Sequence, residues 1–545
     1  RSFGTGAATN SIDDIKDTNC MLVIGANPTA AHPVTGVKIK QKAMKGATLI
    51  VLDPRKTELA KYADFHLAVR PGTNVAVLNM MLHYIVKEGL EDENFISNRT
   101  EGFEEFKNEI LNLDVDKMSE ISGVDKDLAR RAAIAYASAN NAMSFHGLGV
   151  TEHSQGTFTV QLISDLAMIT GNIGRRGVGV NPLRGQNNVQ GSADMGVQPH
   201  QGAGYMDITQ PEVIEQYHQF YGVPVPTEIG FKIPEMFDAA LAKDLKALWI
   251  IGEDVVQTDP NTQKVIKSLE NLDLFVVQEL FMTETAKYAD VVLPGASFLE
   301  KDGTFTNGER RIQRVNAVVS PVGNSKIDGQ IIIDMMNKMG YEQADYNAES
   351  MLEEISQIVP FFKGVTWERL GINGLQWPVK EDGSDTQILH EKTFKSGLGN
   401  FAHFDFKESQ EIVNHGEKYP YILTTNRDLE HYNCGAMTRR TNNVLINTED
   451  VLWINPKDAA EIGINSGDLI CVESDRGKVD IKADVTEGVK PGILSTTFHF
   501  PEIMVNNITS DEHDSEAYCP EYKVVSVNIR KAKNTSFRKA GELEA

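Results

Sequence analysis

The stretch TELAKYAD at residues 57–64 returns as TETAKYAD at residues 283–290, with seven of the eight positions identical. The likeness extends upstream of both octapeptides. The apolar runs MLVIG and LIVLD precede the first copy, and LWIIG and LFVVQE precede the second. Continuous apolar runs are typical of strands buried on both faces of a parallel sheet. A connection of about 20 residues separates the two runs, which is long enough for a crossover helix. Each copy therefore predicts a βαβ unit, and the short runs HLAV and VVLP predict a third strand for each.

The length and the change of pattern along the chain predict three domains. One hydrophobic core does not extend over 545 residues. The first βαβ unit predicts an α/β domain over residues 1–184, and the second predicts another over residues 185–399. Residues 400–545 contain short β runs such as YPYILTT, DLICVES and KVVSVNI, separated by Gly and Asp turns. The predicted fold class is thus α/β: two related α/β domains with duplicated βαβ units, followed by a C-terminal β-barrel domain.

Charge and composition exclude several classes of function. The formal net charge is −23, which argues against a nucleic-acid partner because such partners need a basic face. No run of 18 apolar residues occurs, so no membrane span is predicted. The four cysteines lie far apart without a C-x-x-C pair, so spacing predicts no metal ligands. Scattered reduced cysteines are typical of a cytoplasmic protein, which is the expected location.

The ends of the predicted strands carry groups that can bind a ligand. In α/β proteins ligands bind beyond the carboxyl ends of the strands. Gly25, which aligns with Gly252, allows a close approach of the backbone to a ligand. Asp53 and Glu279 end the following strand of each copy, where a carboxylate can accept hydrogen bonds from a ribose or a base amine. The G-x-G-x-x-G triplet is absent, so NAD is not predicted. Two interpretations stay open: twin sites for a nucleotide-bearing ligand, or two related sheets without one.

A loop rich in amides lies between the two copies. The segment NPLRGQNNVQGSADMG, residues 181–196, holds five Asn or Gln side chains, three glycines and Arg184, with no apolar period. Planar amides suit hydrogen bonding to a heterocycle, and the guanidinium of Arg184 suits a carboxylate or phosphate. The alternative is a polar surface loop between domains.

Several motifs together make the chain similar to a known family. They include IGANPTAAHPV, LDPRKTELAKYADFHLAVRPGTN, HGLGVTEHSQGT, RGQNNVQGSADMG, IIGEDVVQTD, TTNRDLEHYNCGAMTRR and PEYKVVSVNI. With them, over essentially its whole length, the chain resembles the catalytic (alpha) subunit of molybdenum-dependent formate dehydrogenases, within the molybdopterin oxidoreductases. The resemblance implies oxidation of formate at a molybdenum or tungsten centre held between two molybdopterin guanine dinucleotides. Two similar ligands require two similar half-sites, which would account for the repeat.

The resemblance also implies site residues. The first dinucleotide would be held by Gly25, Asn27, Asp53, Arg55, Gly72, Asn74, Gly147 and Gln186. The second would be held by Gly252, Glu253, Asp254, Thr258, Gln278 and Thr283. The C-terminal domain would contribute Thr425, Arg427, His431, Asn507, Tyr522 and Lys523.

Arg184 is the implied catalytic residue, which would orient formate. For each polar residue taken alone, a surface or capping role remains an alternative. His146 and His153 are interpreted as structural. Glu152 stands where relatives often carry glutamine, which leaves its contact with the cofactor in doubt.

The family pattern also includes four cysteines for a [4Fe–4S] cluster and a Cys or selenocysteine followed by His, which ligates the metal. The resemblance assigns these residues to sequence upstream of Arg1, and no Cys-His pair occurs in the 545 residues. No metal ligand is therefore predicted within them, and we expect them to be inactive or nearly so alone. The expected partners are formate and an electron-acceptor subunit or domain.

Two other functions stay open. One is a molybdopterin oxidoreductase acting on a different oxyanion. The other is a metal-free structural relative in a respiratory complex, which the retained Arg184 and amide loop argue against.

Overall fold

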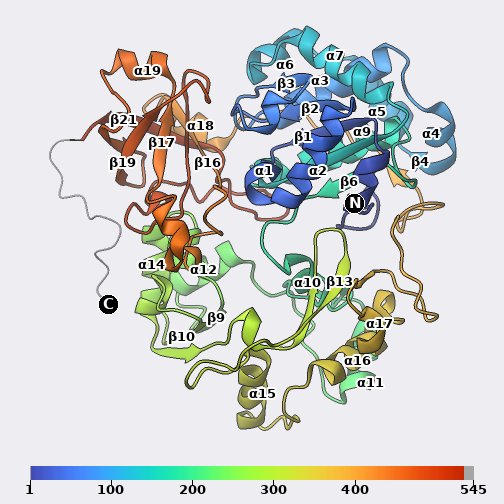
Figure 1. Ribbon diagram of the computed structural model, residues 1–545, viewed down its shortest axis with the longest axis vertical. Coiled ribbons are helices and arrows are strands. Elements are labelled where there is room, and N and C mark those ends of the chain that lie inside the picture. Colours follow the sequence, from blue (N-terminus) through green and yellow to red (C-terminus); the bar gives the residue numbers. More distant parts are fainter. Residues whose placement is uncertain (1, 533–545) are drawn as a thin grey trace. The chain divides into compact units, whose positions relative to one another are not determined.

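The computed structural model describes residues 2–532 (Figure 1). The chain divides into two compact units. The first comprises Arg1–Gly185, Gln257–Gln263 and Ile388–Ala545, and the second comprises Gln186–Val256 and Lys264–Gln387. The predicted division after residues 184 and 399 into three domains stays a prediction.

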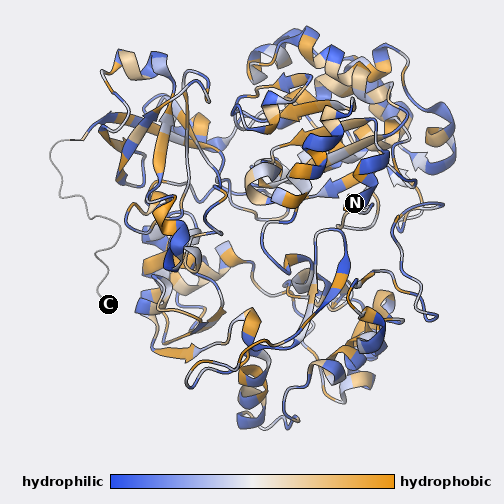
Figure 2. Ribbon diagram, in the orientation of Figure 1, coloured by the Kyte–Doolittle hydropathy of each residue, from blue (hydrophilic) through white to orange (hydrophobic). Residues whose placement is uncertain are grey.

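The first unit contains a five-stranded parallel sheet. Its strands are β1 (Cys20–Ile24), β2 (Thr48–Leu52), β3 (Phe65–Leu67), β5 (Ala142–His146) and β6 (Gly179–Pro182), in the order β3-β2-β1-β5-β6. β1 pairs in parallel with both β2 and β5, as a buried central strand should. Apolar residues run along these strands (Figure 2). The predicted βαβ unit with a third strand is confirmed here.

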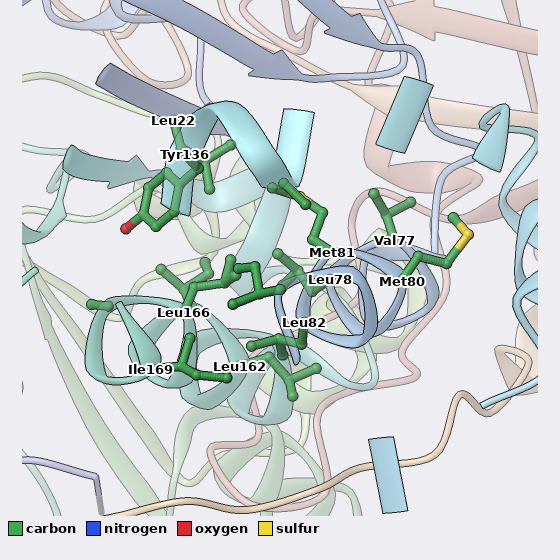
Figure 3. Close-up of a cluster of buried hydrophobic side chains, with 14 of the residues drawn as sticks. Leu22, Val77, Leu78, Met80, Met81, Leu82, Tyr136, Leu162, Leu166 and Ile169 are labelled. Carbon is green, nitrogen blue, oxygen red and sulfur yellow. The ribbon is translucent and has the colours of Figure 1, made fainter. Parts of the chain in front are cut away.

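Alternate residues of the central strands enter two different cores. Leu22 and Leu52 pack with helices α3 (Asn74–Lys87), α7 (Lys126–Ala137) and α9 (Gly156–Ile169) on one face. Figure 3 shows this cluster, in which Leu78 and Leu82 of α3 lie near Leu162 and Leu166 of α9, with Tyr136 of α7 near Leu22. Met21 and Val23 pack on the other face, with Ile39 of α2 (Pro33–Met44). This period of two between the faces is why the strand sequence is apolar throughout.

The first unit contains further helices and short strands outside the five-stranded sheet. They are η1 (Ile12–Asp17), α1 (Pro28–Ala31), η2 (Leu59–Lys61), α4 (Glu93–Arg99), β4 (Thr100–Glu101), α5 (Phe103–Leu111), α6 (Val115–Ser122), α8 (Leu148–Thr151), β15 (Gly399–Asn400) and α18 (Gln410–His415). β15 pairs in parallel with β4, so the chain at residues 399–400 lies beside residues 100–101.

A closed barrel completes the first unit and confirms the predicted C-terminal β-barrel. Its strands are β16 (Tyr421–Thr425), β17 (Val451–Ile454), β18 (Leu469–Glu473), β19 (Lys478–Val485), β20 (Ile493–Thr496) and β21 (Val525–Lys531), in the order β16-β20-β17-β19-β18-β21. Leu423, Leu452 and Val525 belong to its core. Between the strands lie η6 (Thr438–Arg440), η7 (Asn442–Leu445), α19 (Pro456–Glu461) and η8 (Val505–Asn507).

The second unit contains the second copy of the repeat. Strands β9 (Ala247–Ile251), β10 (Leu274–Glu279) and β11 (Val291–Pro294) form a parallel sheet in the order β11-β10-β9. A second sheet contains β12 (Gly303–Thr306), β13 (Arg311–Val315) and β14 (Leu375–Gln376), and a third contains β7 (Gln201–Gly202) and β8 (Met206–Asp207). The second predicted βαβ unit is therefore also confirmed.

Short helices make up the rest of this part of the chain. They are α10 (Val189–Asp194), α11 (Pro211–Tyr221), α12 (Ile233–Leu241), α15 (Asp328–Lys338), α16 (Ala348–Ile358), α17 (Trp367–Leu370), η3 (Thr285–Tyr288), η4 (Phe298–Glu300) and η5 (Pro360–Phe362). Two further helices, α13 (Val255–Thr258) and α14 (Thr262–Glu270), lie where the chain crosses from one unit to the other. Within residues 2–532, no helix combines the length and the apolar character needed to cross a membrane.

The repeated octapeptide has the same structural role in both copies. The backbone N–H of Asp64 donates to the carbonyl of Leu49 (2.9 Å), and the Asp64 carboxylate accepts from the Leu49 N–H (2.9 Å). Asp290 makes the same two hydrogen bonds with Phe275, at 2.9 and 2.7 Å. The final Asp of the octapeptide therefore attaches the segment to the start of the preceding strand and aligns the third strand with it.

Candidate functional site

The turn after β1 contacts the turn after β5 so closely that only glycine fits. Gly25 has a φ of +55°, and a Cβ at this position would lie 2.4 Å from the carbonyl carbon of Gly149. Gly149 in turn donates its N–H to the Gly25 carbonyl (2.9 Å). A Cβ at Gly147 would lie 3.0 Å from the Gly25 oxygen. The two strand ends thus form one joint at the carboxyl edge of the sheet, where α/β folds bind ligands.

The turn before α3 contributes to the same joint. Asn74, the first residue of α3, donates its side-chain N–H to the Gly149 carbonyl (3.0 Å). Gly72 has a φ of +90°, and a Cβ there would lie 3.2 Å from Cγ2 of Val524. The structure therefore brings the predicted residues Gly25, Asn74 and Gly147 together through Gly149.

The end of β2 carries an enclosed ion pair. Nε of Arg55 lies 3.4 Å from Oδ1 of Asp53, and the two side chains are 11% and 5% exposed. The Arg55 N–H also donates to Asp53 Oδ1 (2.9 Å). Asn27, before α1, accepts a hydrogen bond from the Thr29 hydroxyl at its Oδ1 (2.7 Å), which leaves its amide N–H groups pointing away from this contact. Asp53 is therefore already engaged by Arg55, whose guanidinium retains donors for a further acceptor.

A buried lysine from the barrel segment pairs with Glu152. Nζ of Lys523 lies 2.7 Å from Oε2 of Glu152, with both side chains 10% exposed. Lys523 also donates to the carbonyl (3.0 Å) and hydroxyl (3.2 Å) oxygens of Thr425. The Thr425 hydroxyl donates to the carbonyl of Tyr522 (3.1 Å). Burial lowers the pKa of Lys523, and the positive charges of Arg427 and Arg55 lower it further, while Glu152 opposes that change.

Arg427 is the third cation of this group. Its guanidinium lies 4.0 Å from the centre of the Phe498 ring. Among residues 2–532, Arg427 forms no ion pair with a carboxylate. Burial lowers the pKa of Arg427, and the negative charge of Glu152 is the largest effect that opposes this. Arg55, Arg427 and Lys523 thus form a partly enclosed positive region inside a strongly acidic protein.

These residues fit an anionic dinucleotide. In the part of the chain that the structure describes, these three enclosed cations have two carboxylates in direct contact, Asp53 and Glu152, so one positive charge has no such partner there. A guanidinium stacked on an aromatic ring is suited to phosphate. The glycine joint gives a ligand access to backbone groups.

Arg184, the implied catalytic residue, follows β6 at the same edge of the five-stranded sheet. Nη2 of Arg184 donates to the carbonyl of Gly6 (2.5 Å). His146 ends β5, the neighbouring strand, and its Nδ1 is buried without a hydrogen-bond partner. Burial lowers the pKa of His146 to about 4, and the charge of Arg184 contributes to this. The imidazole is therefore neutral at pH 7, and Arg184 is the cationic group of the pair.

The second copy offers a different set of groups. Gly252 has a φ of +67°, and a Cβ there would meet no atom within 4 Å. Asp254 is buried and accepts from the N–H (2.8 Å) and hydroxyl (2.7 Å) of Thr285. Gln278 donates to Asp328 (2.8 Å), while its Oε1 is buried without a partner. That acceptor suits a ligand N–H. The predicted residue Glu253 is exposed.

Other predicted residues lie as follows. The Thr283 hydroxyl accepts from the Ala286 N–H (3.2 Å), which is a capping role. Thr258, which was grouped with the second copy, belongs to the short segment of the first unit, where its carbonyl accepts from the Asn506 side chain (3.0 Å). Asn507 Oδ1 accepts from Gln263 (3.2 Å), and Gln186 is exposed.

His431 is buried with both ring nitrogens engaged. Nδ1 lies 3.2 Å from the Thr438 hydroxyl, and Nε2 lies 2.8 Å from the carbonyl of Asn447. Both ring nitrogens are therefore already used within the protein.

The amide loop uses part of its side chains within the second unit. Asn188 Oδ1 accepts from the Thr306 N–H (2.9 Å). Gln190 donates to Asp194 (2.9 Å) and to the hydroxyl of Tyr205 (2.8 Å). These two amides hold the loop in shape, whereas they were predicted to suit a heterocycle.

Two contributors were missed by sequence reasoning. The first is Gly149, whose backbone packs against Gly25. In the sequence, the two glycines of HGLG were the only indication of such a close approach. His32, in the motif AHP, donates to the Arg184 carbonyl. Within residues 2–532, no group of three or more His, Cys, Asp or Glu side chains is arranged to hold a metal ion.

Comparison with known proteins agrees with this geometry. Residues 3–338 match the family described as Molybdopterin oxidoreductase, and residues 421–526 match the Molydopterin dinucleotide binding domain. The chain belongs to the molybdopterin oxidoreductase family and is an oxidoreductase of that family.

Individual relatives within the molybdopterin oxidoreductase family are formate dehydrogenases. The chain is 43% identical over 536 residues to the F420-dependent formate dehydrogenase subunit alpha of Methanocaldococcus jannaschii, covering 97% of this chain and 79% of that protein. It is 36% identical to formate dehydrogenase H of Escherichia coli, covering 97% of this chain and 75% of that protein. The function is thus formate dehydrogenase-like. Among solved structures, acetylene hydratase from Pelobacter acetylenicus matches with a TM-score of 0.75 at 23% identity, over 97% of this chain and 80% of that one, which shows the shared fold.

Proposed function

We propose that this chain is the body of a formate dehydrogenase, which oxidises formate to carbon dioxide at a molybdenum or tungsten centre carried by two molybdopterin guanine dinucleotides. The observation that carries the proposal is the enclosed group of cations Arg55, Arg427 and Lys523, which within residues 2–532 has two carboxylates in direct contact, Asp53 and Glu152. A pair of diphosphates brings several negative charges, and a protein of net charge −23 must offset them locally.

The residues would divide between the two ligands in the following way. In this proposal residues 1–184 hold the first dinucleotide, residues 185–399 hold the second, and residues 400–545 cap both. Gly25, Asn74 and Gly147 would let the first ligand approach the backbone, and Gln278 Oε1 would accept an N–H from the second. The bound metal centre would supply an acceptor for the two electrons that leave formate.

Arg184 would bind the substrate. Formate is a small anion, and its transfer into a site away from water is unfavourable without a cation. A guanidinium matches the planar carboxylate with two parallel N–H groups, which fixes the direction of the formate C–H bond. The contact with the Gly6 carbonyl (2.5 Å) holds the guanidinium in place before substrate arrives. The neutral His146 beside it does not compete for the anion.

The electrons would leave through an acceptor subunit or domain. A [4Fe–4S] cluster is expected only on an amino-terminal segment that the 545 residues do not include. The prediction that these residues alone turn over little or no formate is tested by assaying them directly.

The main test is Arg184→Lys in the holoenzyme. Lysine keeps the positive charge but lacks the two parallel N–H groups of the guanidinium. The kcat/KM for formate should therefore fall about 100-fold or more. Molybdenum and pterin contents should stay at the level of the unsubstituted enzyme. Arg131→Lys, on the exposed side of α7, is the matched control and should leave kinetics unchanged. Normal kinetics in Arg184→Lys would remove Arg184 from this role.

Two measurements separate the other candidate functions. Metal and pterin analysis of the intact protein distinguishes an enzyme from a metal-free structural relative, because only the enzyme retains both. Parallel assays with formate and nitrate distinguish formate oxidation from activity on another oxyanion.

A further inference from the structure

His32 stands at a rigid junction between two helices. It follows α1 and precedes α2, and its backbone is held on both sides: its N–H donates to the Pro28 carbonyl (3.0 Å), and its own carbonyl accepts from the Gly36 N–H (2.9 Å). A Cβ on Gly36 would lie 2.8 Å from the Pro28 oxygen, so the two helices pack without space. Pro33 further restricts the backbone of His32. The direction of the imidazole is therefore set by the fold.

The imidazole reaches the residue proposed to bind formate. Nε2 of His32 donates to the backbone carbonyl of Arg184. A carbonyl only accepts, so Nε2 carries the hydrogen in this contact. His32 comes from the connection after β1, and Arg184 follows β6; β5, which ends in His146, lies between these strands in the sheet. At the carboxyl edge of the sheet, the hydrogen bond therefore links the segment after β1 to the segment after β6, past the end of β5.

Arg184 is consequently held both at its side chain and at its backbone. Its guanidinium donates to the carbonyl of Gly6 (2.5 Å), and its backbone carbonyl is held by His32. The residue that follows, Gly185, is exposed, and the chain leaves the first unit there.

We propose that His32 is a positioning residue for formate oxidation, which fixes the backbone of Arg184 so that the guanidinium presents its paired N–H groups to the substrate. This rests on the proposed function, in which Arg184 binds formate. In this proposal His32 acts through Arg184, without contacting the substrate itself. The site consequently depends on the geometry of the α1–α2 junction as well as on Arg184.

Steady-state kinetics of the holoenzyme test the proposal. His32→Ala should raise KM for formate about tenfold, because a displaced Arg184 guanidinium binds the anion more weakly. His32→Gln, whose amide can donate to the same carbonyl, should restore KM to within about threefold of the unsubstituted enzyme. A merely structural role would instead lower kcat through a smaller active fraction and leave KM unchanged. That result would overturn the proposal.

A matched control removes a similar hydrogen bond elsewhere in the first unit. His83 of α3 lies with Nδ1 2.9 Å from the carbonyl of Ile110. His83→Ala should lower thermal stability and leave KM for formate unchanged. A rise of KM in His83→Ala equal to that in His32→Ala would assign the effect to general loosening of the fold and overturn the proposal.

A second measurement is independent of activity. Phenylglyoxal modifies accessible guanidinium groups, and peptide mass spectrometry follows the rate at Arg184. His32→Ala should raise this rate about fivefold relative to Arg131 in the same digest, as expected for the loss of one hydrogen bond. An unchanged rate would overturn the proposal. If Arg184→Ala leaves KM for formate unchanged, the proposed function fails; if Arg184→Ala raises KM and His32→Ala does not, only the role of His32 fails.

Discussion

The first copy of the repeat, β1 to β3, and the second, β9 to β11, make the same hydrogen bonds at very different degrees of burial. In both, the strand-end glycine donates to the neighbouring strand, Gly25 to Leu52 and Gly252 to Gln278, each at 2.9 Å. Every residue of β1 is buried. In the second copy, Ile251 is 44% exposed and Val291 is 43% exposed. The repeated sequence therefore encodes strand register, whereas the surrounding elements decide burial.

The two copies of the repeat differ more in the residues at the carboxyl ends of their strands than in the strands themselves. Asp53 of the first copy pairs with Arg55, while the aligned positions of the second copy are Glu279 and Phe281. Gly25 packs against the backbone of Gly149, while the position of Gly252 is open. Duplication of a fold thus leaves the two binding edges free to diverge, and the arginine that pairs with the strand-end acid of the first copy is replaced by phenylalanine in the second.

The largest expected difference between the copies concerns the two glycines. Gly25→Ala places a methyl group against three backbone atoms of Gly149 and Val150, none more than 2.7 Å away. We expect it to lower the free energy of unfolding by about 4 kcal/mol or more. Gly252→Ala meets open space and should cost only about 1–2 kcal/mol, from the positive φ alone. Urea unfolding of both variants gives the comparison, and equal losses would contradict it.

The next effect is a dependence of stability on pH in the first unit. Burial lowers the pKa of His146 and of His153 from 6.5 to about 4. Between pH 6.5 and 4 the unfolded chain binds more protons than the folded one, so these groups contribute stability above pH 6.5 that is lost as pH falls toward 4. Each should contribute about 3 kcal/mol over this window.

Hydrogen exchange measured from pH 7 to pH 4, corrected for intrinsic rates, checks this dependence. Amides of β1 and β5 should lose protection as pH falls. His153→Gln should remove about half of the loss, and His218→Gln, at an exposed position of α11, should remove none. A His153→Gln profile identical to that of the unsubstituted protein would contradict the assignment.

The smallest expected effect is shared by both copies. Asp64→Ala and Asp290→Ala each remove a carboxylate that accepts a strand N–H, at 2.9 and 2.7 Å. Both aspartates are exposed, so each substitution should cost about 1 kcal/mol. Exchange of the Leu49 and Phe275 amides is the measurement.

The aligned lysines of the octapeptide provide controls for this pair. Lys61→Ala and Lys287→Ala, both at exposed positions, should change stability by about 0.5 kcal/mol or less. A loss at Asp64 without one at Asp290 would show that the octapeptide has different roles in the two copies.

Sequence patterns predicted the sheets and the barrel because strand formation depends on local apolar runs. MLVIG became β1, buried on both faces, and KVVSVNI became most of β21. Contacts between distant segments were not predictable in this way. Glu152 forms an ion pair with Lys523, and Thr258 belongs to the first unit. In both cases the interacting segments are far apart in the sequence, so no local pattern indicates the contact. The family motifs indicated Arg184 and the dinucleotide residues, whereas the contact of His32 with Arg184 joins segments about 150 residues apart and no local pattern predicts it.

The crossing of the chain between its two units has a consequence for synthesis on the ribosome. The first unit begins at the amino terminus but includes β21, and β21 pairs with both β16 and β18. A nascent chain therefore cannot close the barrel until residues near 531 have left the exit tunnel. The second unit, complete by Gln387, can fold earlier. Vectorial translation consequently finishes the amino-terminal unit last, and a premature stop before β21 would leave it open.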